Sequence, residues 1–186
     1  MLRRRLHAAG RPEETVVLEQ APPLPQSFEE LWERLDETEF PHLLLTADPA
    51  EALALDESLH APAWAARAWS GLRFLDDYAR AQDFDGNVEA FCKFGAASVL
   101  WSPKHLAITE TKATMDRWGS ERVFPVPAYV HTAKKIQMKA HLKIGNEGKT
   151  APRVHFHDAT RVAGHPPKII IGYIGKHLTN TKTNQL

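Results

Sequence analysis

Two alternating segments in the second half of the chain carry the side chains best suited to chemistry. In Ile136–Ile144 every even position is apolar, and every odd position between them is polar or cationic. In Arg153–Asp158 apolar side chains alternate with one arginine and two histidines. Because successive side chains leave opposite faces of a β-strand, both segments are predicted to be half-buried strands. If the strands pair with their apolar faces together, one sheet face carries six cationic or titratable groups: Lys139, His141, Lys143, Arg153, His155 and His157.

Such a face suits the binding or cleavage of nucleic acid. Lysine and arginine side chains would hold phosphates and stabilise the charge of a phosphorane-like transition state. One histidine with a pKa near about 6.5 could deprotonate a ribose 2′-hydroxyl, and a second could protonate the leaving oxygen, with no metal or other cofactor. The predicted catalytic residues are His141, Arg153, His155, His157 and His177, and the predicted nucleic-acid-binding residues are Lys139, Lys143 and Lys176.

The same residues leave other interpretations open. His155 and His157 are two positions apart, so on a strand they share a face at a spacing of roughly 6.5 to 7 Å and could ligate one metal ion. His141 or His177 would then be the third ligand, which makes a small metal-binding protein one alternative. A non-catalytic nucleic-acid-binding or adaptor module is another alternative. The plainest interpretation is a solvated sheet face whose lysines serve solubility.

The distribution of charge favours an anionic partner for the second half of the chain. The formal net charge is zero, but residues 1–92 carry 8 Lys/Arg against 18 Asp/Glu, a balance of −10. Residues 93–186 carry 15 against 5, a balance of +10, together with 7 of the 10 histidines. Nucleic acid is the commonest partner of such a basic half. Two complementary halves packed on each other are the alternative explanation.

The composition is that of a soluble globular protein, with 43% hydrophobic and 25% charged residues. No apolar run approaches the roughly 18 to 20 residues of a membrane helix, so no membrane partner is expected. The single cysteine, Cys92, cannot form an internal disulfide. A reducing compartment, and therefore the cytoplasm, is the expected location.

The pattern of elements predicts an α+β fold in which an acidic helical part packs on a C-terminal antiparallel sheet with a basic, histidine-rich face. A capping box at Ser27 and Glu30 starts one helix, Asp48 and Pro49 start a second, and a long helix runs from Pro62 to about residue 82. Residues 97–101 and 106–110 are predicted to form a hairpin, residues 111–121 a loop, and residues 123–130 an edge strand or extended segment. In the last predicted strand, 168–174, Gly172 would let a ligand or backbone approach closely. The expected organisation is a lead-in over 1–26, a helical part over 27–95 and a sheet part over 96–186, together one compact domain.

The C-terminal order of these motifs resembles the end of RelE/HigB-type toxins. The resemblance rests on a basic strand, then Arg153-Val-His-Phe-His157, then Lys168-Ile-Ile-Ile-Gly-Tyr-Ile-Gly-Lys-His177. It covers about 45 residues, and the chain is about twice the usual length of such toxins. The resemblance implies an mRNA-cleaving protein whose sheet carries basic residues and histidines. It also implies an acidic protein partner, and self-association is the alternative.

Overall fold

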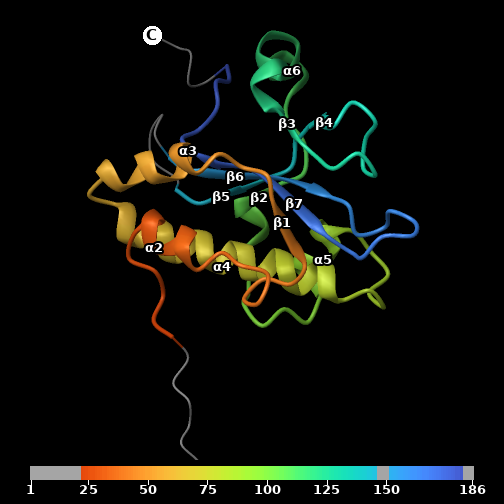
Figure 1. Ribbon diagram of the computed structural model, residues 1–186. Helices are drawn as coiled ribbons and strands as arrows, with labels where there is room; N and C mark the ends of the chain where they lie inside the picture. Colours follow the sequence, from red (N-terminus) through yellow and green to blue (C-terminus); the bar gives the residue numbers. More distant parts are fainter. Residues whose placement is uncertain (1–21, 146–150, 182–186) are drawn as a thin grey trace, which may run out of the picture.

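The computed structural model describes residues 22–145 and 151–181, which are built around one five-stranded sheet (Figure 1). The α-helices of these residues are α2 (Phe28–Glu33), α3 (Pro49–Leu53), α4 (Ala61–Arg80), α5 (Val88–Phe94) and α6 (Lys112–Trp118). Short 3-10 helices are η1 (Ala54–Glu57), η2 (Pro103–His105) and η3 (Gly119–Arg122). Most of the predicted lead-in, residues 1–21, lies outside the described residues.

The main sheet has the strand order β1-β7-β6-β5-β2. Its strands are β1 (Leu43–Leu45), β2 (Leu106–Ala107), β5 (His141–Lys143), β6 (Arg153–Asp158) and β7 (Ile169–Gly175). A second sheet pairs β3 (Val123–Pro125) with β4 (Lys135–Gln137). The predicted α+β class is confirmed, but the expectation of a purely antiparallel, C-terminal sheet is wrong. β1 comes from the N-terminal part and runs parallel to β7 at the edge of the sheet, so the sheet is mixed.

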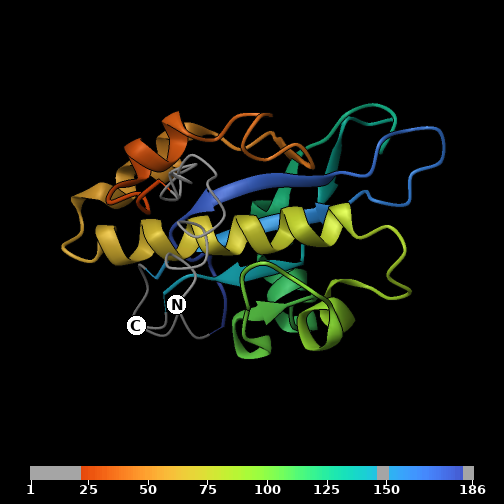
Figure 2. The ribbon, with the colours of Figure 1, turned by 90° about the horizontal axis from the view of Figure 1, so that it is seen from below.

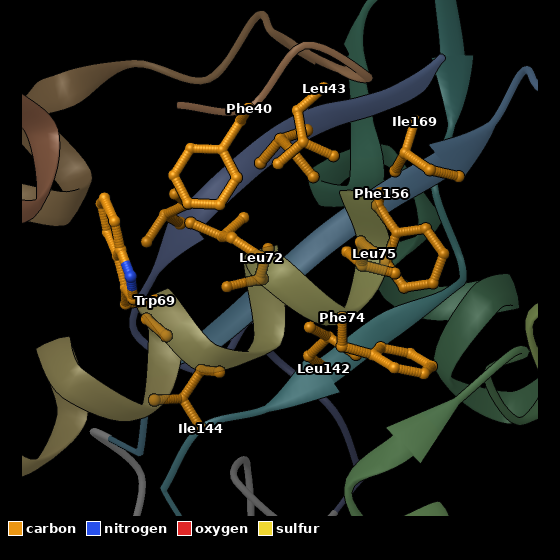
Figure 3. Close-up of a cluster of buried hydrophobic side chains, with 14 of the residues drawn as sticks. Phe40, Leu43, Trp69, Leu72, Phe74, Leu75, Leu142, Ile144, Phe156 and Ile169 are labelled. Atoms are coloured by element: carbon orange, nitrogen blue, oxygen red, sulfur yellow. The ribbon is translucent and has the colours of Figure 1, made fainter. Parts of the chain in front are cut away.

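Helices cover one face of the sheet. The long helix α4 runs across this face, with α2 and α5 on the same side (Figures 1 and 2). Its side chains Leu72 and Leu75 are fully buried against Leu142 of β5 and Phe156 of β6 (Figure 3). This layer is the main hydrophobic core, and it takes up Leu142 and Ile144 of the first predicted strand and Val154 and Phe156 of the second.

A smaller layer, made of β3, β4, η3 and α6, covers the opposite face (Figure 1). Its own core contains Met138 and Val126, and it packs on Ile170 of β7. The centre of the predicted basic face is therefore covered: His141, Arg153 and His155 are buried, whereas Lys139 is exposed and Lys143 and His157 are half-buried. Gly172, predicted to admit a ligand, is instead filled by the chain itself: a Cβ there would meet the Met138 sulfur at 2.5 Å and Phe124 Cβ at 2.7 Å.

The predicted continuous strand Ile136–Ile144 is wrong, although its alternation is real. Residues 135–137 form β4 in the small sheet and residues 141–143 form β5 in the large sheet. Between them the backbone crosses from one layer to the other, with the Met138 N–H donating to the Arg122 carbonyl at 2.8 Å. One sequence pattern thus serves two sheets.

Two further expectations differ from the structure. No hairpin joins 97–101 to 106–110, because the short β2 pairs with β5 and Trp101 is buried in the main core. Residues 112–118, predicted as loop, form α6, whose N-cap Thr111 accepts a hydrogen bond from the Thr114 N–H. The predicted starts at Ser27 and Asp48 are confirmed, with both side chains accepting cap hydrogen bonds. Of the described helices, none has the length and apolar character to span a bilayer.

Candidate functional site

The strand registers place the candidate residues in two adjacent rows on the covered face of the sheet. His141 of β5 pairs with His155 of β6, which in turn pairs with Tyr173 of β7. Two positions along, Lys143 pairs with Arg153. Directly opposed residues of antiparallel strands point to the same face, so both rows face the small layer. The predicted pairing of the two strands with their polar faces together is therefore present.

A carboxylate joins the two histidines of the first row. Glu110, in the segment between β2 and α6, comes close enough that one ligand atom each from Glu110, His141 and His155 lie within 4.8 Å of one another. The two imidazole centroids are 4.8 Å apart. His155 is 1% exposed and His141 5% exposed, so this cluster is inside the protein. We call Glu110, His141 and His155 the acid–histidine cluster.

Main-chain carbonyls fix the tautomers of both histidines. The Nδ1–H of His141 donates to the Lys139 carbonyl at 3.1 Å, and the Nδ1–H of His155 donates to the Met138 carbonyl at 3.0 Å. A carbonyl oxygen can only accept, so Nδ1 carries the proton in the neutral rings. Nε2 then holds the lone pair that can accept a proton or bind a cation. The backbone bend between β4 and β5 supplies both carbonyls.

Burial keeps these imidazoles neutral. It lowers the pKa of His141 to about 4, against the smaller raising effects of the Lys139 carbonyl and of Glu110. Burial also lowers the pKa of His155 well below its ordinary value, and the neighbouring His141 lowers it further. A charged imidazole cannot be solvated in this position, whereas a neutral one keeps its hydrogen bond to the carbonyl. Neither ring is therefore protonated at neutral pH unless an anion binds beside it.

Two buried guanidinium groups flank the cluster. Arg122, at the end of η3, is fully buried and its Nε donates to Glu110 Oε1 at 3.0 Å. Arg153 is 8% exposed, and its Nη1 donates to the carbonyls of Gly145 at 2.8 Å and Pro152 at 2.9 Å. Burial lowers the pKa of Arg153 to about 10, and Glu110 opposes that effect.

The remaining predicted residues lie at different depths around the cluster. Lys139 is exposed and Lys143 is half-buried, with its Nζ donating to the Lys104 carbonyl at 3.4 Å. His177, half-buried just after β7, lies near enough to lower the pKa of His141 and of His155.

Two predicted residues, Lys176 and His157, are not part of the cluster. Lys176 is exposed and lines a shallow pocket with Trp64 and Glu57 on another part of the surface. His157 pairs with Ile170 in the β6–β7 register and is not among the three residues whose ligand atoms converge. Among the described residues, His155 and His157 therefore do not form the predicted pair of metal ligands. The β6–β7 register shifts between His155 and Phe156. His155 therefore pairs with Tyr173, whereas His157 pairs with Ile170 and not with Ile171.

Sequence reasoning missed two central residues of the site. Glu110 ends the second predicted hairpin segment, 106–110, Arg122 lies between the predicted loop 111–121 and the predicted segment 123–130, and neither belongs to an alternating pattern of polar side chains. Tertiary packing alone brings them to the histidines. The chain matches no known protein family, no characterised protein and no solved structure. The function proposed below therefore rests on the geometry of the site.

Proposed function

We propose that the chain binds nucleic acid, with RNA favoured, through phosphate contacts on the rim of the acid–histidine cluster. The observation that supports the proposal is an excess of positively charged side chains that are buried in the protein. Arg122 and Arg153 are both at least nine-tenths buried, and Glu110 is the carboxylate that influences both of them. A buried charge is costly unless it is paired. Glu110 pairs with Arg122, whereas the hydrogen bonds of Arg153 go to main-chain carbonyls, so a phosphate beside Arg153 would be stabilised.

The neighbouring cations extend this attraction to the surface. Lys143 stands beside Arg153 across the β5–β6 ladder, and Lys139 is exposed two residues before β5. The Nε of Arg153 is buried and has no hydrogen-bond partner among the described residues. A phosphate oxygen is the acceptor that an arginine fork and two lysines suit. RNA is favoured over DNA by the resemblance to RelE/HigB-type toxins.

Salt-dependent binding of a fluorescently labelled single-stranded RNA tests this proposal. Lys139→Ala and Lys143→Ala should each weaken binding and reduce the slope of log K against log salt by about 0.7, the value for one lost phosphate contact on a single strand. Lys93→Ala, which removes the same charge from α5 in the helical layer, is the matched control and should change neither quantity. Equal losses in all three variants would mean that binding is non-specific, and an unchanged slope in the two site variants would overturn the proposal.

Phosphodiester cleavage at the same place is a second candidate function, favoured by the approach of a carboxylate to an imidazole. Glu110 Oε1 lies 3.8 Å from His141 Nδ1. The carboxylate offers a second candidate general base beside the histidine of the predicted metal-independent mechanism. Of the nearby histidines, half-buried His177 is better placed to reach a leaving oxygen than His155. A toxin-like protein would use this chemistry against mRNA, with an acidic protein partner covering the basic rim.

Cleavage of a labelled RNA, together with inhibition of host growth on expression, tests this candidate. His177→Asn should lower the cleavage rate by about 100-fold or more, as expected for the loss of a general acid. His131→Asn, in the exposed loop between β3 and β4, is the control and should cleave normally. If the His177→Asn protein retained full cleavage and toxicity, the catalytic candidate would be excluded while phosphate binding remained under its own test.

A further inference from the structure

The acid–histidine cluster combines the ligand types of a transition-metal site with a fixed orientation of both rings. Two imidazoles and one carboxylate are the protein ligands of many open zinc and iron centres. Each comes from a different part of the chain: Glu110 from the segment after β2, His141 from β5 and His155 from β6. The adjacent strands hold both histidines in register, so the cluster is built into the sheet.

From this geometry we propose that Glu110, His141 and His155 bind one divalent transition-metal ion such as Zn²⁺. The binding itself rests on the geometry of the cluster alone. Its use would rest on the proposed function, where the metal would be the cofactor of phosphodiester hydrolysis.

The distances allow such a site after small movements. Metal–ligand bonds of about 2.0 to 2.2 Å place neighbouring ligand atoms of a four-coordinate centre roughly 3.3 to 3.6 Å apart. The three ligand atoms lie within 4.8 Å of one another. For the ligand atoms that approach within 4.8 Å, closing to coordination distance requires a contraction of about 1.5 Å at most. Small shifts of the Glu110 carboxylate and of the two imidazoles, with the Nδ1 hydrogen bonds kept, would supply this contraction.

The hydrogen bonds around the cluster match those that support metal ligands. A metal-binding histidine usually donates its other ring N–H to a carbonyl or carboxylate, which fixes the ring and makes it more basic. Both histidines do this through Nδ1 to the carbonyls of Lys139 and Met138. Glu110 receives the Arg122 hydrogen bond on Oε1, so Oε2 is the oxygen that a metal would take.

The choice of metal follows from the donors and the surrounding charge. Imidazole nitrogen suits Zn²⁺, Fe²⁺ and similar ions, whereas Mg²⁺ and Ca²⁺ prefer oxygen ligands. The nearby guanidinium groups of Arg122 and Arg153 repel a bare dication, and a phosphate group bound beside them would offset this repulsion. Metal and phosphate are therefore expected to occupy this face together, with three protein ligands leaving a coordination position for water or substrate.

Calorimetric titration of the metal-stripped full chain with Zn²⁺ alone tests the proposal. The expected result is one site, with His141→Asn and His155→Asn each weakening Zn²⁺ binding by about 100-fold or more, since second-shell changes already cost 10- to 100-fold. His157→Asn is the matched control, because this histidine lies on the same strand outside the cluster, and it should bind Zn²⁺ like the unchanged protein. Circular dichroism and thermal melting establish that each variant is folded.

Other outcomes overturn the proposal. Loss of Zn²⁺ binding in His157→Asn as large as in His155→Asn would indicate a His-x-His site on β6. Millimolar or weaker binding by the unchanged chain would remove the metal from this cluster. A second measurement, the visible absorption of bound Co²⁺, reports nitrogen ligation in any variant that folds. RNA affinity measured on the same His155→Asn protein separates the two proposals, because phosphate contacts by Lys139 and Lys143 do not require this ring.

Discussion

The buried histidine pair should make the protein markedly less stable as the pH falls from 7.5 to 5. In the folded state the pKa of His155 lies well below its ordinary value of 6.5, because the ring is buried and faces His141. In the unfolded chain the ring is solvated and takes up a proton below about pH 6.5. Acid therefore stabilises the unfolded state and leaves the folded state unprotonated. The free energy of unfolding is therefore little affected by this ring above the unfolded-state pKa of about 6.5. It decreases progressively as the pH falls below that value.

The size of this pH effect follows, for each histidine, from the difference between its pKa in the folded state and its pKa in the unfolded chain. Each pH unit below the unfolded pKa costs about 1.4 kcal/mol per histidine that stays neutral in the fold. At pH 5, about 1.5 units below, His155 accounts for about 2 kcal/mol. His141, whose folded pKa is about 4, contributes about the same amount. Together they remove about 4 kcal/mol, a large share of the 5 to 15 kcal/mol that is typical of whole domains.

Urea unfolding followed by tryptophan fluorescence measures this effect at pH 7.5 and pH 5.0. The change in the free energy of unfolding between the two pH values should be smaller by about 2 kcal/mol in His155→Asn and by about 4 kcal/mol in the double variant with His141→Asn. Asparagine keeps a donor for the main-chain carbonyl but does not titrate. Groups with the opposite sign, such as buried Asp76 with its raised pKa, cancel in this comparison. Identical pH dependence in the unchanged and variant proteins would refute the burial argument.

Further predictions concern stability at neutral pH, measured as the free energy of unfolding in urea. Leu142→Ala, in the fully buried main core, should cost about 2 to 5 kcal/mol, whereas Leu100→Ala, at a side chain that is 90% exposed, should stay within about 0.5 kcal/mol. Thr111→Ala should cost about 0.5 to 2 kcal/mol through loss of the α6 cap, and an unchanged value would mean that this helix does not depend on its cap. Gly172→Ala should cost about 1 to 3 kcal/mol because the added carbon would overlap side chains of the small layer. Gly164→Ala meets no atom, so its cost should come from its positive φ of 76° and stay near about 1 kcal/mol; a smaller cost at Gly172 than at Gly164 would contradict the packing argument.

Local patterns were sufficient to predict α2, α3 and α4, although not α6, and to identify the polar side chains of the central strands. The cap at Ser27 and the apolar stripe of α4 are written in residues three and four positions apart, which is the range over which helices form. The alternation in β6 likewise placed His155 on the same face as Arg153, but it did not reveal the register shift between His155 and Phe156. These features depend on near neighbours in the chain, and so one sequence is enough to find them.

The rest depends on contacts between distant segments. Nothing near Glu110 in the sequence indicates that it meets Arg122 and His141, since all three lie on different elements. The alternation over Ile136–Ile144 could not reveal that the chain changes sheets at Met138, because both halves keep the same period of two. Burial of the polar face followed from that change. An alternating pattern predicts on which face of a strand a side chain lies. Whether that face is exposed to solvent depends on the layer that packs against it.

The position of β7 between β1 and β6 has a consequence for how the protein is made. β7 is the last strand of the sheet in the chain, and a hydrogen bond such as Thr46 Oγ1 to the Ile171 carbonyl spans 125 positions. During synthesis, β1 therefore emerges long before its partner and has no ladder to join. Contacts of such long range are slow to form, so the nascent chain keeps its Leu-Leu-Leu segment unpaired until nearly all of the sheet has been translated. Truncation before β7 would separate β1 from β6 and leave two incomplete halves, each with an exposed apolar edge for chaperones to bind.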